Sequence, residues 1–278
     1  MTPTPAAAAF RALHQSGCFV LPNPWDVGSA RFLAQLGFKA LASTSAGFAY
    51  TLGRPDSVTA VPCEAVLAHV AALASATALP VNADFQNGYA DEPEGVAANV
   101  ARCVRAGAAG LSIEDATGDK VRPLYDRGLA VERVRAARAA IDASGSGVVL
   151  TARCEAWLVG HPEPEREALD RLVAFADAGA DCLFAPGVRD PAAIERLVKA
   201  VAPRPLNVVV SSPGPGLTLQ HLGELGVRRI SLGSALARVA WGAFMRAAKS
   251  IQETGTFDGL SGLAPFAELN GIFEGKER

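Results

Sequence analysis

Short apolar runs alternate with longer amphipathic segments along this sequence, and the pattern repeats about every thirty residues. The short runs consist almost wholly of Val, Leu, Ile and Ala, which is typical of parallel strands buried on both faces. The predicted strands are Cys18–Leu21, Ala40–Ser43, Pro80–Asp84, Leu111–Glu114, Val148–Arg153, Cys182–Ala185, Leu206–Val210 and Arg229–Leu232. The predicted helices are Val27–Leu36, Cys63–Ala76, Pro93–Arg105, Val131–Asp142, Pro164–Ala178, Pro191–Val201, Thr218–Leu225 and Ser234–Gln252.

This alternation predicts the fold class. Eight strand–helix pairs in 278 residues indicate one α/β domain, residues 1–278, folded as a (β/α)8 barrel of the TIM type. The alternative is an open doubly wound sheet. Its usual nucleotide signature is missing, because no G-x-G-x-x-G follows the first predicted strand, and Gly214-Pro215-Gly216 is interpreted as a rigid turn.

The two ends of the chain differ in character. Met1–Ala9 is rich in small residues and has neither a basic region nor a long apolar core, so we expect a frayed end rather than a signal peptide. The segment from Glu253 to Arg278 is apolar, and we expect it to pack on this subunit or on a neighbour. No apolar stretch reaches the length of a transmembrane helix.

Composition narrows the classes of partner. The 26 basic and 28 acidic residues give a formal net charge of −2, and no basic patch supports a nucleic-acid or membrane-surface role. A small anionic substrate must therefore be held by a few local groups. The five cysteines are scattered and form no C-x-x-C pair, which indicates a reducing, cytoplasmic location.

Acidic and amide side chains end two neighbouring predicted strands. Asn82 and Asp84 close the third strand, and Glu114 closes the fourth. The carboxyl ends of parallel strands meet at one rim, where α/β barrels place their chemistry. Hard oxygen ligands of this kind suit Mg²⁺ or Mn²⁺ better than zinc, so we predict a metal site at this rim.

Two further strand ends offer groups that bind carboxylates. The second strand runs into the small residues Ser43, Thr44, Ser45 and Ala46, whose backbone N–H groups are candidates for holding a substrate carboxylate. A tightly packed steric turn is the alternative. Arg153 ends the fifth strand and is suited to fork onto a substrate carboxylate or onto Glu114. A purely structural Arg–Glu pair is the alternative there.

The longest polar connection, residues 116–128, follows the fourth strand. Long polar loops at this rim are often lids, and this loop contains Lys120, Arg122 and Tyr125. Each of the three is a candidate for closing over an anion, and a solvated loop outside the chemistry is the alternative for each.

Four segments in this order resemble the isocitrate lyase/phosphoenolpyruvate mutase superfamily: Leu52–Asp56, Val81–Tyr89, Gly110–Asp115 and Ala152–Ala156. The resemblance extends roughly from Leu21 to Arg246. It implies a barrel whose eighth helix is exchanged between subunits, in a homodimer or homotetramer. It also implies cleavage or formation of a C–C or P–C bond beside a carboxylate, through an enolate or oxyanion held on Mg²⁺.

The resemblance also implies roles for individual residues. Ser43 to Ala46 match the turn that binds the substrate carboxylate, and Asp56 matches a catalytic loop aspartate. Asp84 and Glu114 match metal-site acids, and Arg153 matches the arginine that holds the substrate.

Three departures from the family pattern bear on function. Asn82 stands where the family has an aspartate, which removes a negative charge and should weaken the metal site. The lid reads Lys120-Val121-Arg122-Pro123-Leu124, so the catalytic lysine is kept and the general-acid cysteine of the lyase branch is missing. Tyr125 or a water molecule must then replace that cysteine as proton donor. The Asn and Ser/Thr of the mutase branch are absent too.

The sequence therefore leads to one main hypothesis and two alternatives. The main hypothesis is a Mg²⁺-dependent lyase that acts on a small 2-oxo or 2-hydroxy carboxylic acid, by C–C cleavage or decarboxylation, and releases a 2-oxo acid. The first alternative is a catalytically weak protein that binds 2-oxo acids. The second is an enzyme of P–C chemistry, similar to a phosphonopyruvate hydrolase or mutase.

Overall fold

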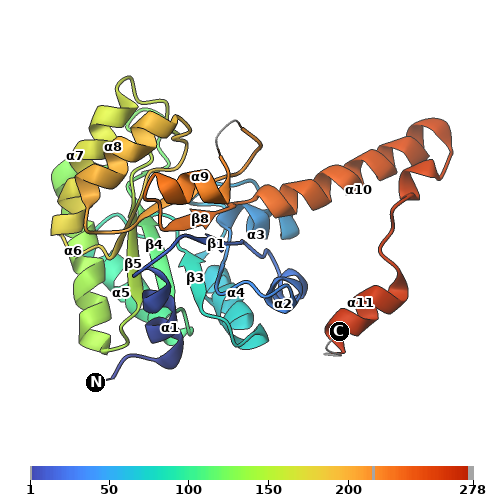
Figure 1. Ribbon diagram of the computed structural model, residues 1–278, viewed down its shortest axis with the longest axis horizontal. Coiled ribbons are helices and arrows are strands. Elements are labelled where there is room, and N and C mark those ends of the chain that lie inside the picture. Colours follow the sequence, from blue (N-terminus) through green and yellow to red (C-terminus); the bar gives the residue numbers. More distant parts are fainter. Residues whose placement is uncertain (1, 215–216, 275–278) are drawn as a thin grey trace.

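An eight-stranded parallel sheet forms the centre of the protein in the computed structural model, which describes residues 2–214 and 217–274 (Figure 1). The strands are β1 (Phe19–Leu21), β2 (Leu41–Ala42), β3 (Val81–Asp84), β4 (Gly110–Glu114), β5 (Val149–Arg153), β6 (Cys182–Phe184), β7 (Leu206–Val209) and β8 (Arg229–Ser231). They pair in the order β1-β8-β7-β6-β5-β4-β3-β2. Between the two ends of this order, the Ala42 amide donates a hydrogen bond of 3.0 Å to the Pro22 carbonyl.

The sheet is therefore a nearly closed barrel, so the predicted (β/α)8 fold is confirmed and the open-sheet alternative is wrong. The helices between the strands are α2 (Val27–Gln35), α4 (Cys63–Ala76), α5 (Pro93–Arg105), α6 (Arg127–Ser144), α7 (Pro164–Asp177), α8 (Pro191–Val201), α9 (Leu219–Glu224) and α10 (Ala235–Thr254). Additional short elements are α1 (Pro5–Leu13), α3 (Ser45–Thr51), the 3-10 helix η1 (Asp258–Leu260) and α11 (Phe266–Phe273). Pro215 and Gly216 of the predicted rigid turn lie outside the described residues.

Helix α1 corrects the expectation of a frayed N-terminus. Thr4 caps it, because its hydroxyl accepts a hydrogen bond of 3.2 Å from the Ala7 amide, and Pro5 at the first helical position has the φ that a helix needs. The side chains of Ala7 and Phe10 are fully buried. Phe10 packs against Ala109 and Val149, beside the first residues of β4 and β5. Helix α1 therefore closes the end of the barrel from which the strands start.

We expect the substitution Phe10→Ala to lower the free energy of unfolding by about 3–5 kcal/mol, because it leaves a cavity at this closed end. Chemical denaturation monitored by circular dichroism measures the change. The control is Phe257→Ala, since Phe257 is 67% exposed and its removal should cost little. Equal stability of the two variants would show that α1 is dispensable for closing the barrel.

Alternate residues of each strand point into the barrel and form two polar layers. Asn82, Ser112, Thr151, Asn207 and Arg229 belong to the lower layer, and all of them are buried. The next inward-facing residues toward the strand ends are Asp84, Glu114 and Arg153, and Glu114 pairs in register with Arg153. The strand alternation therefore delivers three charged side chains to one rim.

Helix α10 projects away from the barrel instead of covering it (Figure 1). Ala237 is its one buried residue, whereas Val239, Trp241, Phe244 and Met245 are 40–69% exposed. The chain then turns back, and α11 packs on α2 through a hydrogen bond of 2.7 Å from Gln35 Nε2 to the Ile272 carbonyl. The apolar tail thus packs partly on its own subunit, and residues 275–278 lie outside the described part.

None of the helices within residues 2–214 and 217–274 has both the length and the apolar character needed to cross a membrane.

Candidate active site

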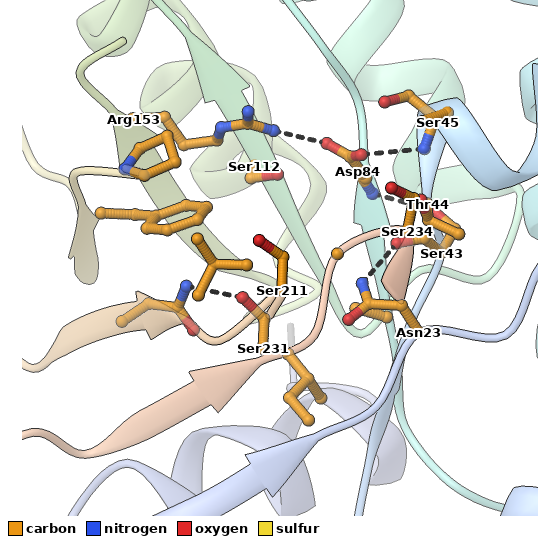
Figure 2. A pocket seen from close by; sticks show the side chains of 18 of the residues that line it. Asn23, Ser43, Thr44, Ser45, Asp84, Ser112, Arg153, Ser211, Ser231 and Ser234 are labelled. Carbon is orange, nitrogen blue, oxygen red and sulfur yellow. Dashed lines mark hydrogen bonds and ion pairs between the residues drawn. The ribbon is translucent and has the colours of Figure 1, made fainter. Parts of the chain in front are cut away.

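A cavity of about 250 Å³ opens at the carboxyl ends of the strands (Figure 2). Its walls include predicted site residues from three strand ends and one loop: Ser43, Thr44, Ser45, Ala46, Asp56, Asn82, Asp84 and Arg153. Further lining residues that the sequence did not single out include Asn23, Ser112, Asn207, Ser211, Ser231 and Ser234. The size of the cavity and the polar side chains in its wall favour a small, hydrogen-bonding ligand.

Asp84 joins the second and third strand ends. Its amide donates a hydrogen bond of 2.8 Å to Ser43 Oγ, and its Oδ2 accepts one of 2.9 Å from the Ser45 amide. Asn23 supports this arrangement from the β1 side, because its Nδ2 donates to the Ser43 carbonyl at 2.8 Å. The carboxylate of Asp84 is therefore fixed in orientation before any ligand binds.

The predicted carboxylate-binding turn is the first turn of helix α3, and Thr44 is its N-cap. The amide of Ser43 donates to the Asn82 carbonyl and that of Ser45 donates to Asp84, so neither is available to a ligand. Within the described part of the chain, the amides of Thr44 and Ala46 have no protein acceptor at hydrogen-bonding distance. These two N–H groups are therefore candidate donors for a substrate carboxylate.

Arg153 lies among three carboxylates. Its Nη1 is 2.6 Å from Asp84 Oδ1, its Nη2 is 3.0 Å from Glu114 Oε2, and its Nε donates to Glu155 Oε1 at 3.0 Å. The predicted contact with Glu114 is therefore present, but Arg153 is not a simple Arg–Glu pair. Glu155 is a site residue that sequence reasoning missed. The sequence indicates Glu155 only through its position two residues after Arg153, because alternate residues of an extended chain point to the same side.

The charges of this cluster do not balance. One guanidinium faces three carboxylates, and Asp56 lies nearby at the mouth of the cavity. Burial raises the pKa of Glu114 well above its ordinary value, since the pairing with Arg153 is opposed by the charges of Glu155 and Asp84. The surplus of negative charge favours a cation beside Arg153.

Asn82 lies one inward-facing position below Asp84 on β3. It is buried, and its Oδ1 has no hydrogen-bond partner. Within residues 2–214 and 217–274, no three His, Cys, Asp or Glu side chains form a preformed metal-binding group. Asp84 and Asn82 line the cavity, whereas Glu114 lies against Arg153 and is not part of the cavity wall. Their carboxylate and amide oxygens are the type of ligand that Mg²⁺ or Mn²⁺ prefers, and these three residues are the candidate ligands.

Asp56 lines the cavity and is exposed. Partial burial and the charge of Asp84 raise the pKa of its carboxyl, and Arg153 and a hydrogen bond with the Ser45 side chain oppose that rise. A carboxyl with a raised pKa at the entrance of a cavity is suited to proton transfer.

The structure does not bring the predicted lid residues to the cavity. Lys120 is exposed and is not part of the cavity wall. The loop is held by its own hydrogen bonds, including one of 2.6 Å from Thr117 Oγ1 to the Arg122 carbonyl. The hydroxyl of Tyr125 donates to Asp91 at 2.5 Å, and burial together with this bond raises its pKa to about 12. Tyr125 is therefore poorly placed to replace the missing cysteine.

Comparison with known proteins agrees with this geometry. A sequence model of the family described as phosphoenolpyruvate phosphomutase matches residues 10–252. An oxaloacetate decarboxylase of Rhodopseudomonas palustris is 31% identical, over 94% of this chain and 89% of its own.

Two solved structures are similar over nearly their whole length. A protein of Burkholderia cenocepacia, described at the level of lyase or mutase, has 46% identity and a TM-score of 0.92, covering 98% of this chain and 96% of its own. Oxaloacetate acetylhydrolase in complex with oxalate has 28% identity and a TM-score of 0.85, covering 98% and 95%.

The fold and the rim of acids around one arginine define a (β/α)8-barrel enzyme of the lyase and mutase class. The chain belongs to the phosphoenolpyruvate mutase/isocitrate lyase superfamily.

Proposed function

We propose that this protein is a Mg²⁺- or Mn²⁺-dependent lyase that breaks a C–C bond in a small 2-oxo or 2-hydroxy carboxylic acid and releases a 2-oxo acid. The observation that supports this most directly is the Arg153 cluster, in which three fixed carboxylates surround one guanidinium beside two unused backbone N–H groups. Two relatives act on oxaloacetate by name, which favours oxaloacetate-type acids as the substrate class.

The residues of this chain bind and orient such an acid in the proposed reaction. The N–H groups of Thr44 and Ala46 hold the carboxylate next to the 2-oxo group. Arg153 donates to the same end of the substrate from the opposite wall. Asp84 and Glu114, with Asn82 beneath them, hold the divalent cation. A bound cation would supply the positive charge that stabilises the negative charge developing on the 2-oxo oxygen.

Proton transfer follows bond cleavage. In decarboxylation, the bond between C3 and the leaving carboxylate breaks, CO2 departs, and the bonding electrons stay with the 2-oxo-acid fragment. The C3 atom later takes a proton. Asp56 is the titratable side chain at the mouth of the cavity that is placed to move this proton, directly or through water.

A panel of acids tests this function. The wild-type protein is incubated with oxaloacetate, 2-methylmalate, 2,3-dimethylmalate and phosphonopyruvate, with Mg²⁺, with Mn²⁺ and with EDTA. Release of 2-oxo acids and of phosphate is followed for each. Saturable, cation-dependent release of a 2-oxo acid from oxaloacetate or from either substituted malate supports the proposal. Phosphate release from phosphonopyruvate alone would favour the P–C alternative.

The second candidate function is binding of 2-oxo acids without turnover. The specific observation that favours it is the position of Lys120 and Tyr125 outside the cavity, which leaves the loop without a proton donor at the site. Calorimetric binding of oxaloacetate or its unreactive analogue oxalate, with no product formed over hours, is the result that this candidate predicts.

We further propose that the protein forms a homodimer or homotetramer in which α10 packs against a partner subunit. We also propose that it is located in the reducing cytoplasm. The exposed apolar side chains on α10 support the assembly, because a monomer rarely exposes so much apolar surface on one helix. The five cysteines, all unpaired, support the location.

We expect the substitution Phe244→Glu to reduce the oligomer to a smaller species, because Phe244 is 61% exposed on α10 and a carboxylate there would be buried at the interface. Light scattering coupled to size-exclusion chromatography measures the mass. The control Lys249→Glu changes a charge on the same helix without removing apolar surface. A monomeric wild-type protein would contradict the proposed assembly.

A further inference from the structure

A second and larger cavity, of about 580 Å³, lies at the opposite end of the barrel. It is bounded by the end of α1 and by the segments that lead into β6, β7 and β8. Arg11, His14, Arg204 and Arg228 line it, with Asp181 as its acidic residue. We refer to the cavity lined by these five residues as the lower cleft. None of them belongs to the catalytic cavity.

Positive charge is in excess in the lower cleft. Among the described residues, no carboxylate lies within ion-pair distance of Arg204 or Arg228, and Arg228 uses one N–H group on the Gly17 carbonyl at 3.2 Å. Asp181 is shared by two arginines, since Arg11 Nη1 lies 2.7 Å from its Oδ1 and Arg138 Nη1 lies 2.9 Å from its Oδ2. The acid in the cleft is therefore already neutralised.

A buried arginine, Arg229, lies between His14 and the catalytic cavity, whose wall it lines, so its charge acts on both cavities. Arg229 is 2% exposed, and its hydrogen-bond partners are neutral: Asn207 Oδ1 at 2.8 Å, Thr151 Oγ1 at 3.0 Å and His14 Nε2 at 3.2 Å. The charge of a buried guanidinium is normally met by a carboxylate. No carboxylate of the described chain forms an ion pair with Arg229.

His14 stays neutral between Arg229 and the cleft. Its Nδ1 lies 2.8 Å from the Phe10 carbonyl, which can only accept, so Nδ1 carries the proton and Nε2 accepts from Arg229. His14 is therefore an uncharged residue in the wall of the lower cleft. No neighbouring carboxylate neutralises the charge of Arg229. The net charge of the whole chain is −2, so this gathering of arginines is local.

We propose that the lower cleft binds a compact multivalent oxyanion, such as phosphate or a polycarboxylate, through the guanidinium groups of Arg204 and Arg228. Guanidinium groups match phosphate and carboxylate oxygens in pairs, and a ligand with more than one negative charge uses the excess of both arginines. The lower cleft and the catalytic cavity lie at opposite ends of the strands. The proposed anion binding does not depend on the proposed function.

Isothermal titration calorimetry tests the site on the full chain in a buffer free of phosphate, with inorganic phosphate in one arm and citrate in the other. We expect a Kd of about 1 mM or tighter for at least one of them. The anion that binds with the lower Kd shows whether the site prefers a tetrahedral anion or a carboxylate. Binding should weaken at least tenfold in the double variant Arg204→Gln/Arg228→Gln and should persist in Arg204→Lys/Arg228→Lys.

Two controls distinguish binding in the lower cleft from binding elsewhere on the protein. Arg31→Gln/Arg105→Gln removes the same charge from positions outside the cleft and should leave binding unchanged. Arg153→Lys alters the catalytic cavity, which is itself proposed to bind hydroxy acids, so this control uses inorganic phosphate, whose binding should be unchanged. The proposal is overturned if neither anion binds, if both double glutamine variants weaken binding equally, or if Arg153→Lys removes phosphate binding.

Discussion

Replacing Arg153 by alanine is expected to lower the free energy of unfolding by about 3–5 kcal/mol and to abolish turnover. The loss of stability follows from the three carboxylates that would be left without their cation, at distances of 2.6 Å for Asp84, 3.0 Å for Glu114 and 2.8 Å for Glu155. The loss of turnover follows because the same guanidinium binds the substrate in the proposed reaction. Chemical denaturation and oxo-acid release measure the two effects separately.

Arg171→Ala is the matched control for this experiment. Arg171 is buried and pairs with Asp115 at 3.2 Å and with Glu167 at 2.6 Å, but it does not line the cavity. Its removal should lower the free energy of unfolding by a similar amount. Turnover measured below the melting temperature of the variant should be mostly retained. An Arg153→Ala protein as stable as the wild type would mean that the three carboxylates do not depend on Arg153.

Asp56→Asn is expected to reduce turnover by about 10²–10⁴-fold, because an amide keeps the shape of the side chain but cannot transfer a proton. Substrate affinity should change far less. The control Asp119→Asn removes an exposed carboxylate of the loop that is not part of the cavity wall. Steady-state kinetics with the best acid of the panel provide kcat and KM for each variant.

The pH profile distinguishes proton transfer from a structural role of Asp56. Its raised pKa means that the protonated carboxyl, which donates the proton to C3, persists to a higher pH than for an ordinary aspartate, so wild-type decarboxylation should fall as the pH rises through a pKa above about 3.9. Asp56→Asn should lack this limb. An unchanged limb in the variant would assign it to another group and remove Asp56 from the proposed proton transfer.

The sequence was sufficient to predict the barrel because strands buried on both faces leave a pattern that does not depend on the details of packing. Asp84, Glu114 and Arg153 could be placed at one rim for the same reason, since they end neighbouring parallel strands. Helix α1 was missed although Thr4 and Pro5 are a normal start signal. Its identity as a closing helix depends on the burial of Phe10 against strands far along the chain.

The parts of the site that were missed depend on individual hydrogen bonds. Both Ser45 and Ala46 belong to the predicted turn, yet the Ser45 amide is taken by Asp84 and the Ala46 amide is not. Lys120 follows the family pattern in sequence, but the bonds within its loop hold it away from the cavity. Backbone direction and loop conformation of this kind are set by tertiary contacts that no local pattern encodes.

Turnover as a function of divalent-cation concentration tests the central proposal most directly, in the wild type, in Asp84→Ala and in Asn82→Asp. We predict saturable activation of the wild type by Mg²⁺ or Mn²⁺ and loss of turnover in Asp84→Ala. We also predict activation of Asn82→Asp at a lower cation concentration, because the added carboxylate supplies the charge that the unpaired Asn82 oxygen lacks. Wild-type turnover that is unchanged after exhaustive chelation, or retained in Asp84→Ala, would contradict a cation site at the ends of β3 and β4.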